Sequence, residues 1–237
     1  MKKNTDGMKN TDEQGRARTE KEGLIPKHGG YRNLKTFQLA ELIYDITVRF
    51  CDKYIDRRSR THDQMVQAAR SGRQNIAEGS VDSATSRKME MKLTGVAKGS
   101  LEELRLDYED FLRQRGLPKW EPDHPGLKRF KVRRCATMNE FRAWVAEEMK
   151  RAEKNTDKQG LTRTENIPPT RGVRASPCVS VFVANGVLSL LNLCCFLLGR
   201  QLQAQAAVFE REGGFTERLY RRRSTYRSDG QNKQASP

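Results

Sequence analysis

The chain has 237 residues, of which 35% are hydrophobic and 32% are charged, a composition typical of a helix-rich globular protein. Its formal net charge of +15 favours polyanionic partners such as nucleic acid or an anionic membrane surface. The sequence has no phosphate-binding glycine loop, zinc-ligand spacing or HExxH motif, which excludes those classes of site. We expect no secretory signal peptide, and the five cysteines lack C-x-x-C spacing, so a cytoplasmic location is predicted.

Residues 1–30 are polar, rich in glycine and poor in aromatic side chains, which predicts a disordered arm. Residues 31–116 then predict the first three helices. The first runs from Tyr31 to about Asp56, where apolar residues recur at steps of three and four. Thr61 and Gln64 have the form of a capping box that opens the second helix, and Gly79 is expected to end it. The inner face of that helix is small enough for close helix contact: Met65, Ala69, Gly72 and Ile76. The third helix is expected over about 85–115.

Residues 117–183 predict a basic loop, a short amphipathic helix over 137–151 and a polar linker. The segments "KNTDEQGRARTE" at 9–20 and "KNTDKQGLTRTE" at 154–165 agree at nine of twelve positions, which favours a duplicated DNA segment over chance. Codons for "NTDKQG", read from the opposite strand, can encode a sequence close to "PCVSVF" at 177–182. We therefore hypothesise that residues from about 154 to 183 translate an inserted inverted repeat. The hypothesis requires complementarity of these two segments in the gene.

The stretch "CVSVFVANGVLSLLNLCCFLLG", Cys178 to Gly199, contains no charged residue and is long enough to span a bilayer. Polar residues at 185, 189 and 192 share one side, and the helix continues into the amphipathic "RQLQAQAAVFERE". These features favour a bundle helix over 184–212 followed by a basic suffix over 213–237, and a membrane anchor is the less favoured alternative. Because this helix is apolar nearly all round, we expect a neighbouring subunit to cover part of it. The predicted homo-oligomer interface comprises Leu188, Leu191, Phe196 and Leu197.

These elements predict an all-α protein: an up-down-up-down four-helix bundle with an N-terminal arm, an insertion before the fourth helix and a basic suffix. The motif "NIAEG" at 75–79, followed by "GSLEEL" at 99–104, resembles the bacterial four-helix bundle proteins of rRNA intervening sequences. That family includes the accessory variability determinant of diversity-generating retroelements, and residues 184–223 resemble the variant with a C-terminal suffix. The resemblance implies a ring, a pentamer in the best-known members, with a basic exterior that contacts nucleic acid. In the retroelement members the ring also serves a reverse transcriptase.

Carboxylates gather on the third helix, but no Glu-x-x-His motif accompanies them, so a solvated face is preferred to a metal cluster. We therefore predict no enzyme activity, and no metal, cofactor or small-molecule substrate. Asn75 and Glu78 lie one turn apart, where we expect them to hydrogen-bond across the bundle or cap a neighbouring helix. Loss of the Glu78 carboxylate is then expected to damage folding or assembly more than RNA binding.

Clusters of basic residues predict contact with nucleic acid, RNA rather than DNA, through the backbone and shape without base readout. They lie at the first bend, on the second helix, in the 117–136 loop and in the suffix: Arg57, Arg58, Arg60, Arg70, Arg73, Arg129, Lys131, Arg133, Arg134, Arg221, Arg222 and Arg223. The favoured function is a non-catalytic, oligomeric nucleic-acid-binding bundle, serving as an accessory to a reverse transcriptase or to an rRNA intervening sequence. The alternatives are a protein-interaction scaffold that does not bind nucleic acid and, less favoured, a membrane-anchored protein.

Overall fold

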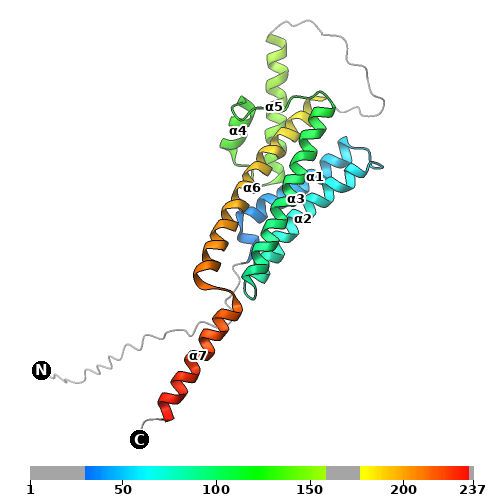
Figure 1. Cartoon of the computed structure of the whole chain (residues 1–237). Coiled ribbons are helices and arrows are strands. Elements are labelled where there is room, and N and C mark those ends of the chain that lie inside the picture. The colour runs from blue at the N-terminus through cyan, green and yellow to red at the C-terminus, as the bar shows by residue number, and fades with distance from the viewer. Residues whose placement is uncertain (1–29, 159–176, 235–237) are drawn as a thin grey trace, which may run out of the picture.

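The computed structural model describes residues 30–158 and 177–234, and all regular secondary structure within them is helical (Figure 1). The predicted all-α class is therefore confirmed, whereas the predicted arm lies outside the described residues except for Gly30. A short 3-10 turn, η1, over Tyr31–Asn33 precedes the first long helix. The remaining helices are α1 (Lys35–Tyr54), α2 (Arg60–Asp82), α3 (Arg87–Gln114), α4 (Pro125–Arg133), α5 (Met138–Lys158), α6 (Pro177–Glu212) and α7 (Phe215–Gln234).

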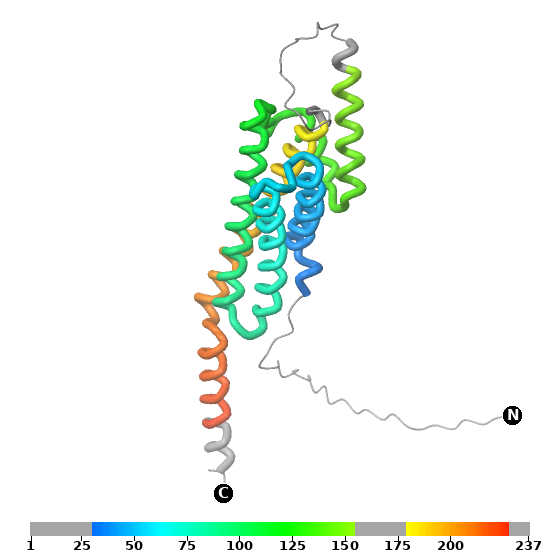
Figure 2. Tube along the Cα trace, turned by 90° about the vertical axis from the view of Figure 1, so that its right-hand side faces the viewer, coloured from blue at the N-terminus to red at the C-terminus, as the bar shows by residue number. Residues whose placement is uncertain are grey.

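Four long helices form the body of the molecule. Along its perimeter α1 packs on α2, α2 on α3, α3 on α6, and α6 back on α1. The neighbours α3 and α6 run antiparallel. This direction places Arg87, at the start of α3, where it donates a hydrogen bond to Glu212, at the end of α6. The short helix α4 packs on α6, and α5 packs on α6 and α1. The last helix, α7, extends beyond this body in both views (Figures 1 and 2).

Close approach of α2 and α3 depends on two glycines. A Cβ added to Gly72 would lie 2.6 Å from Leu101 of α3, and one added to Gly79 would lie 3.3 Å from the Cβ of Leu93. The small inner face predicted for α2 is present, since Met65, Ala69, Gly72 and Ile76 are all buried. The predicted ends of α2 differ from the structure. The side chain of Ser59 caps its N-terminus by accepting from the Thr61 backbone N–H, and the helix passes Gly79 to end at Asp82.

Helix α3 begins after the Ser86 cap and follows its predicted range closely. Its core side includes Tyr108, whose hydroxyl donates to Thr47 Oγ1 at 3.1 Å inside the body. Not every apolar residue of α3 faces inward: Met89 and Val96 are exposed, whereas Thr94 and Ala97 are buried.

The segment expected to be a basic loop contains α4. Pro125 stands in the first turn, the His124 ring accepts from the Gly126 N–H, and Arg134 ends the helix in the left-handed conformation with φ 52°. Helix α5 follows, and a capping box precedes it: the Glu140 carboxylate accepts from the Ala136 and Thr137 backbone N–H groups. This helix continues to Lys158, past the predicted end at 151.

Helix α6 begins at Pro177, seven residues before the predicted start at 184. Val181 and Phe182 are buried in the core, so residues 179–183 belong to the packed helix and not to a linker. The first residues of the hypothesised insertion, 154–158, belong to α5, and residues 159–176 lie outside the described residues. The predicted suffix is also helical, since α7 covers most of 213–237.

Candidate nucleic-acid interface

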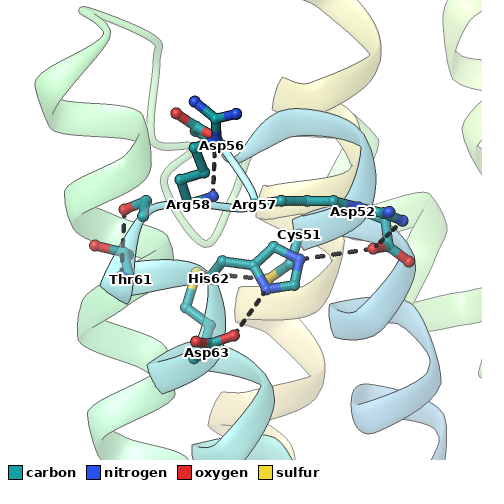
Figure 3. Close-up of polar contacts among 10 residues, drawn as sticks. Cys51, Asp52, Asp56, Arg57, Arg58, Thr61, His62 and Asp63 are labelled. Carbon is teal, nitrogen blue, oxygen red and sulfur yellow. Dashed lines mark hydrogen bonds and ion pairs between the residues drawn. The ribbon is translucent and has the colours of Figure 1, made fainter.

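The bend between α1 and α2 places two of the predicted arginines, Arg57 and Arg58, beside aspartates (Figure 3). Arg57 forms an ion pair with Asp52 at 3.0 Å, and the Arg58 backbone N–H donates to Asp56 at 3.0 Å. Arg60 opens α2 and is exposed, with Asp63 three residues further on. The local aspartates therefore offset much of the positive charge that the sequence places at this bend.

His62 lies between two of those aspartates. Its Nε2 is 3.6 Å from Asp52 Oδ1 and its Nδ1 is 3.5 Å from Asp63 Oδ1, with the side chain 16% exposed. Neither ring nitrogen has a hydrogen-bond partner among the described residues. Nearby, burial is the main cause that raises the pKa of the Cys51 thiol to about 12, so this thiol stays protonated at neutral pH.

The arginines of α2 differ from each other. Arg70 is exposed and has no acidic partner within the described part of the chain. Arg73 lies over the ring of Tyr44, 4.6 Å from its centroid, and so contributes a cation–π contact between α2 and α1. Only the first of these two guanidinium groups is freely presented to solvent.

The basic residues of α4 are largely bound to α5. Arg129 makes two hydrogen bonds, at 2.6 and 2.5 Å, to Glu148, whose carboxylate is almost fully buried. Arg133 pairs with Glu147 at 2.8 Å, and this hydrogen bond is the main cause that lowers the pKa of Glu147. Lys131 donates to the Pro122 carbonyl at 3.0 Å. Arg134 remains exposed without an acidic partner among the described residues.

Helix α7 presents arginine and tyrosine together. Arg221 is exposed and donates to the Glu212 carbonyl at 3.2 Å, Arg223 is exposed, and Arg222 is half-buried. Tyr220 and Tyr226 are 74% and 62% exposed. The sequence reasoning missed these tyrosines as a binding feature, although the run "LYRRRSTYR" at 219–227 places each tyrosine next to an arginine. Proteins that bind single-stranded nucleic acid combine exposed aromatic rings, which stack on the bases, with cations, which contact the phosphates.

The predicted structural motif on α2, Asn75, Glu78 and Gly79, does not make the contacts that were expected of it. Glu78 is exposed, so it is not a buried carboxylate that needs a partner, and the expected damage from its loss has no structural basis. Asn75 donates to the carbonyl and hydroxyl oxygens of Ser71 within α2. The contact across to α3 is made by Ser71 instead, whose hydroxyl lies 3.0 Å from that of Ser100. Gly79 acts by permitting the approach of α3.

The four residues predicted for an oligomer interface differ in burial. Leu188 and Leu191 are buried within the chain itself, which excludes them from the surface of a single protomer. Phe196 is 61% exposed and Leu197 is half-buried, so these two remain on the outer side of α6. Other exposed apolar residues of α3 and α6 were not predicted for this interface: Val96, Leu106 and Leu193.

A groove of about 830 Å³ is lined by residues of α1, α3, α4 and α6. Its apolar lining includes Leu39, Leu127, Leu190 and Leu193, and Trp120 stands at one side. The segment leading into α4 is attached to the groove wall by the buried Asn185. The Asn185 Oδ1 accepts from the Trp120 N–H at 2.7 Å, and its Nδ2 donates to the Pro118 carbonyl at 3.0 Å.

Within the described ranges, no group of three or more His, Cys, Asp or Glu side chains could hold a metal ion. The thiols of Cys51, Cys135, Cys194 and Cys195 all have raised pKa values, with burial as the first cause. None of these four is therefore an activated nucleophile.

The apolar part of α6 is long enough to cross a membrane by length and composition, and 67% of the residues in that part are buried inside the fold. The core helix of a water-soluble protein gives the same result, so this observation does not distinguish the two classes. The chain matches no protein-family model, and no curated protein and no solved structure matches it either.

Proposed function

We propose that this chain is a non-catalytic, homo-oligomeric four-helix bundle of the cytoplasm that binds nucleic acid, single-stranded RNA in preference to DNA. The observation that carries the proposal is α7. Arg221, Arg223 and Arg227 are exposed there, and none of them has an acidic partner among the described residues. Tyr220 and Tyr226 lie on the same helix and are largely exposed. Guanidinium groups would contact phosphates while the tyrosine rings stack on unpaired bases.

The position of α7 supports this role. It extends from the body as a separate helix, so a strand could reach its sides without displacing other parts of the chain (Figure 2). The preference for RNA rests on the motifs that resemble the rRNA intervening-sequence proteins. By the same resemblance we propose that the chain acts as an accessory, either to a reverse transcriptase or to such an intervening sequence.

Two glycines on α3 support self-association. Gly95 and Gly99 lie four residues apart, and an added Cβ would meet nothing within 4 Å at either position. Glycine in a helix interior costs about 1 kcal/mol relative to alanine, and no contact within the described residues explains that cost here. Close approach by a helix of a second copy would explain it, and the exposed Leu106 and Phe196 supply apolar area on α3 and α6.

The bundle itself is proposed from the helix contacts. Each of α1, α2, α3 and α6 packs on two of the other three, and this pattern of contacts supports a four-helix bundle. In this arrangement α4, α5 and α7 are additions outside the four. A pentamer is the assembly we propose, following the resemblance.

The first experiment measures binding of the full chain to a labelled single-stranded RNA and to the DNA of the same sequence by fluorescence anisotropy. We expect tighter binding to RNA and a linear fall of log affinity with log salt concentration. Absence of binding at low salt would overturn the nucleic-acid proposal and favour the scaffold alternative. Recovery of the chain only with the membrane fraction would favour the anchored alternative.

The second experiment measures mass by light scattering for wild type and for Gly95→Ala/Gly99→Ala. The substitutions should raise the stability of each protomer by about 2 kcal/mol in total, yet weaken self-association because methyl groups block the approach. Gln114→Ala, at an exposed position near the end of α3, is the control and should change neither quantity much. A wild-type monomer at all concentrations would contradict the oligomer.

A further inference from the structure

The groove beside α4 is not used by the proposed function. Its lining combines an apolar floor with cations, and its volume of about 830 Å³ falls in the range of pockets for small organic ligands. The floor is formed by leucines from α1, α4 and α6, and the indole of Trp120 flanks it. An apolar ligand body would therefore be covered on several sides.

The charges around this groove are unequally compensated. Arg105 and Lys119 both pair with Glu109, at 2.9 and 3.0 Å, so these side chains are partly neutralised. Lys35, Lys131 and Arg134 line the same groove and have no carboxylate partner among the described residues. Glu121 is the other acidic residue of the lining and is exposed on the rim. The remaining excess of positive charge favours an anionic ligand.

From this combination we infer that the groove binds a small amphipathic organic anion, a molecule with an apolar body and a carboxylate or phosphate head. The apolar body lies against the leucine floor, and the head lies near Lys35 and Arg134. A segment as basic as α7 from a second copy is disfavoured by the same charges, and a neutral apolar ligand would leave the cations without a partner. This site is separate from α7 and does not depend on the proposed nucleic-acid binding.

The test uses decanoate, decanol and decyltrimethylammonium, which share one tail and differ in the charge of the head. Binding to the full chain is measured by calorimetry and by tryptophan fluorescence, because Trp120 lines the groove. We expect decanoate to bind more tightly than decanol, and the cation to bind most weakly. Equal binding of all three, or no binding of decanoate below its micelle concentration, would overturn the inference.

A charge-reversal variant locates the head. Lys35→Glu/Arg134→Glu should weaken decanoate binding about tenfold and leave decanol binding unchanged. Lys35 begins α1, where a glutamate also suits the helix dipole, so loss of that helix is not expected. Lys128→Glu/Lys150→Glu changes the net charge equally at exposed positions outside the groove lining, and should bind decanoate as wild type does. Equal weakening by both doubles would contradict a local site.

A third variant tests the apolar floor. Leu193→Asp should weaken decanoate and decanol together, because it places a charge where the tail lies. Substitution of the α7 arginines should leave decanoate binding unchanged, which keeps this inference distinguishable from the proposal about nucleic acid. Retention of full affinity by Leu193→Asp would show that the tail lies elsewhere and would overturn the site.

Discussion

The two most basic helices, α4 and α7, differ in what lies beside their arginines. In α4, Arg129 and Arg133 are bound by Glu148 and Glu147 of α5. In α7, Arg223 and Arg227 are exposed with no acidic partner among the described residues. An arginine already held by a carboxylate must give up that hydrogen bond before it contacts a phosphate, whereas an unpaired one loses only hydration. The density of basic residues in a sequence is therefore a poor guide to the surface that binds a polyanion.

The shape of the molecule adds to this difference. Helix α4 packs on α6 and forms one side of the groove. Its Arg129 and Arg133 also connect it to α5 through their ion pairs. Helix α7 extends away from the body and has exposed tyrosines (Figure 1). We therefore expect α7 to dominate binding of RNA and α4 to contribute mainly to structure, and four experiments test this expectation.

The largest effect is expected from α7. Replacing Arg221, Arg223 and Arg227 by serine should lower RNA affinity about a hundredfold at low salt and reduce the salt slope by about 2. The measurement is anisotropy at several salt concentrations. The control replaces three exposed cations of α4 and α5 by serine, an equal change of charge: Lys128, Arg142 and Lys150. Equal weakening by the two triples would refute the distinction between the helices.

The difference between α4 and α7 could not be predicted from the sequence. Periodicity found α1, α2 and α3 because each has an extended apolar stripe, and it found the apolar centre of α6 for the same reason. It missed α4, a nine-residue helix whose only buried residues are Gly126, Leu127 and Phe130. The pairs Arg129–Glu148 and Arg133–Glu147 join residues that are distant in sequence, so they exist only once α4 and α5 lie together.

Burial explains the other misplaced residues. The sequence shows that α6 is apolar on most sides, but not which side its own chain covers, so Leu188 and Leu191 were assigned to an interface although they are in the core. Glu78 was expected to hydrogen-bond across the bundle or to cap a neighbouring helix, yet it is exposed. The order of helices around the body decides such cases, and it depends on contacts between distant segments.

The second prediction concerns Asn185, which attaches the segment before α4 to α6. Asn185→Leu leaves the Trp120 N–H and Pro118 carbonyl without their partner, and should lower the free energy of unfolding by about 2–3 kcal/mol. Chemical denaturation measures this loss, and hydrogen exchange should locate the loosening at α4. RNA affinity should stay near the wild-type value.

Asn192→Leu is the control for this substitution, because Asn192 is exposed on the same helix and should tolerate leucine. If Asn185→Leu lowered RNA affinity as much as the α7 triple does, α4 would have to be counted within the binding surface. That result would remove the contrast between the two helices.

A smaller effect is expected when the arginines of α4 are released. Glu147→Gln/Glu148→Gln removes the negative partners of Arg133 and Arg129, and should raise RNA affinity about threefold to tenfold. The protein should also become less stable, because Glu148 is buried beside Arg129. Glu153→Gln/Glu210→Gln makes the same change of charge at exposed positions. If this control raised affinity equally, net charge and not pairing would explain the gain.

The smallest effect is a pH dependence at the start of α5, the helix that carries the partners of α4. Hydrogen bonds from the Ala136 and Thr137 backbone N–H groups lower the pKa of Glu140 below its ordinary value. A carboxylate with a lowered pKa in the folded state stabilises the protein above its unfolded pKa of about 4.3, and this contribution disappears as pH falls through the folded value. Glu140→Gln should therefore lower the Tm slightly at pH 7 and leave it equal to wild type at pH 3, measured by thermal unfolding. Glu153→Gln, on the same helix without that cap, should match wild type at both pH values. If the Tm of Glu140→Gln stayed below that of wild type by the same amount at pH 3, the charge of Glu140 would not stabilise the start of α5. It would then also give no support to the ion pairs between α4 and α5, which distinguish α4 from α7.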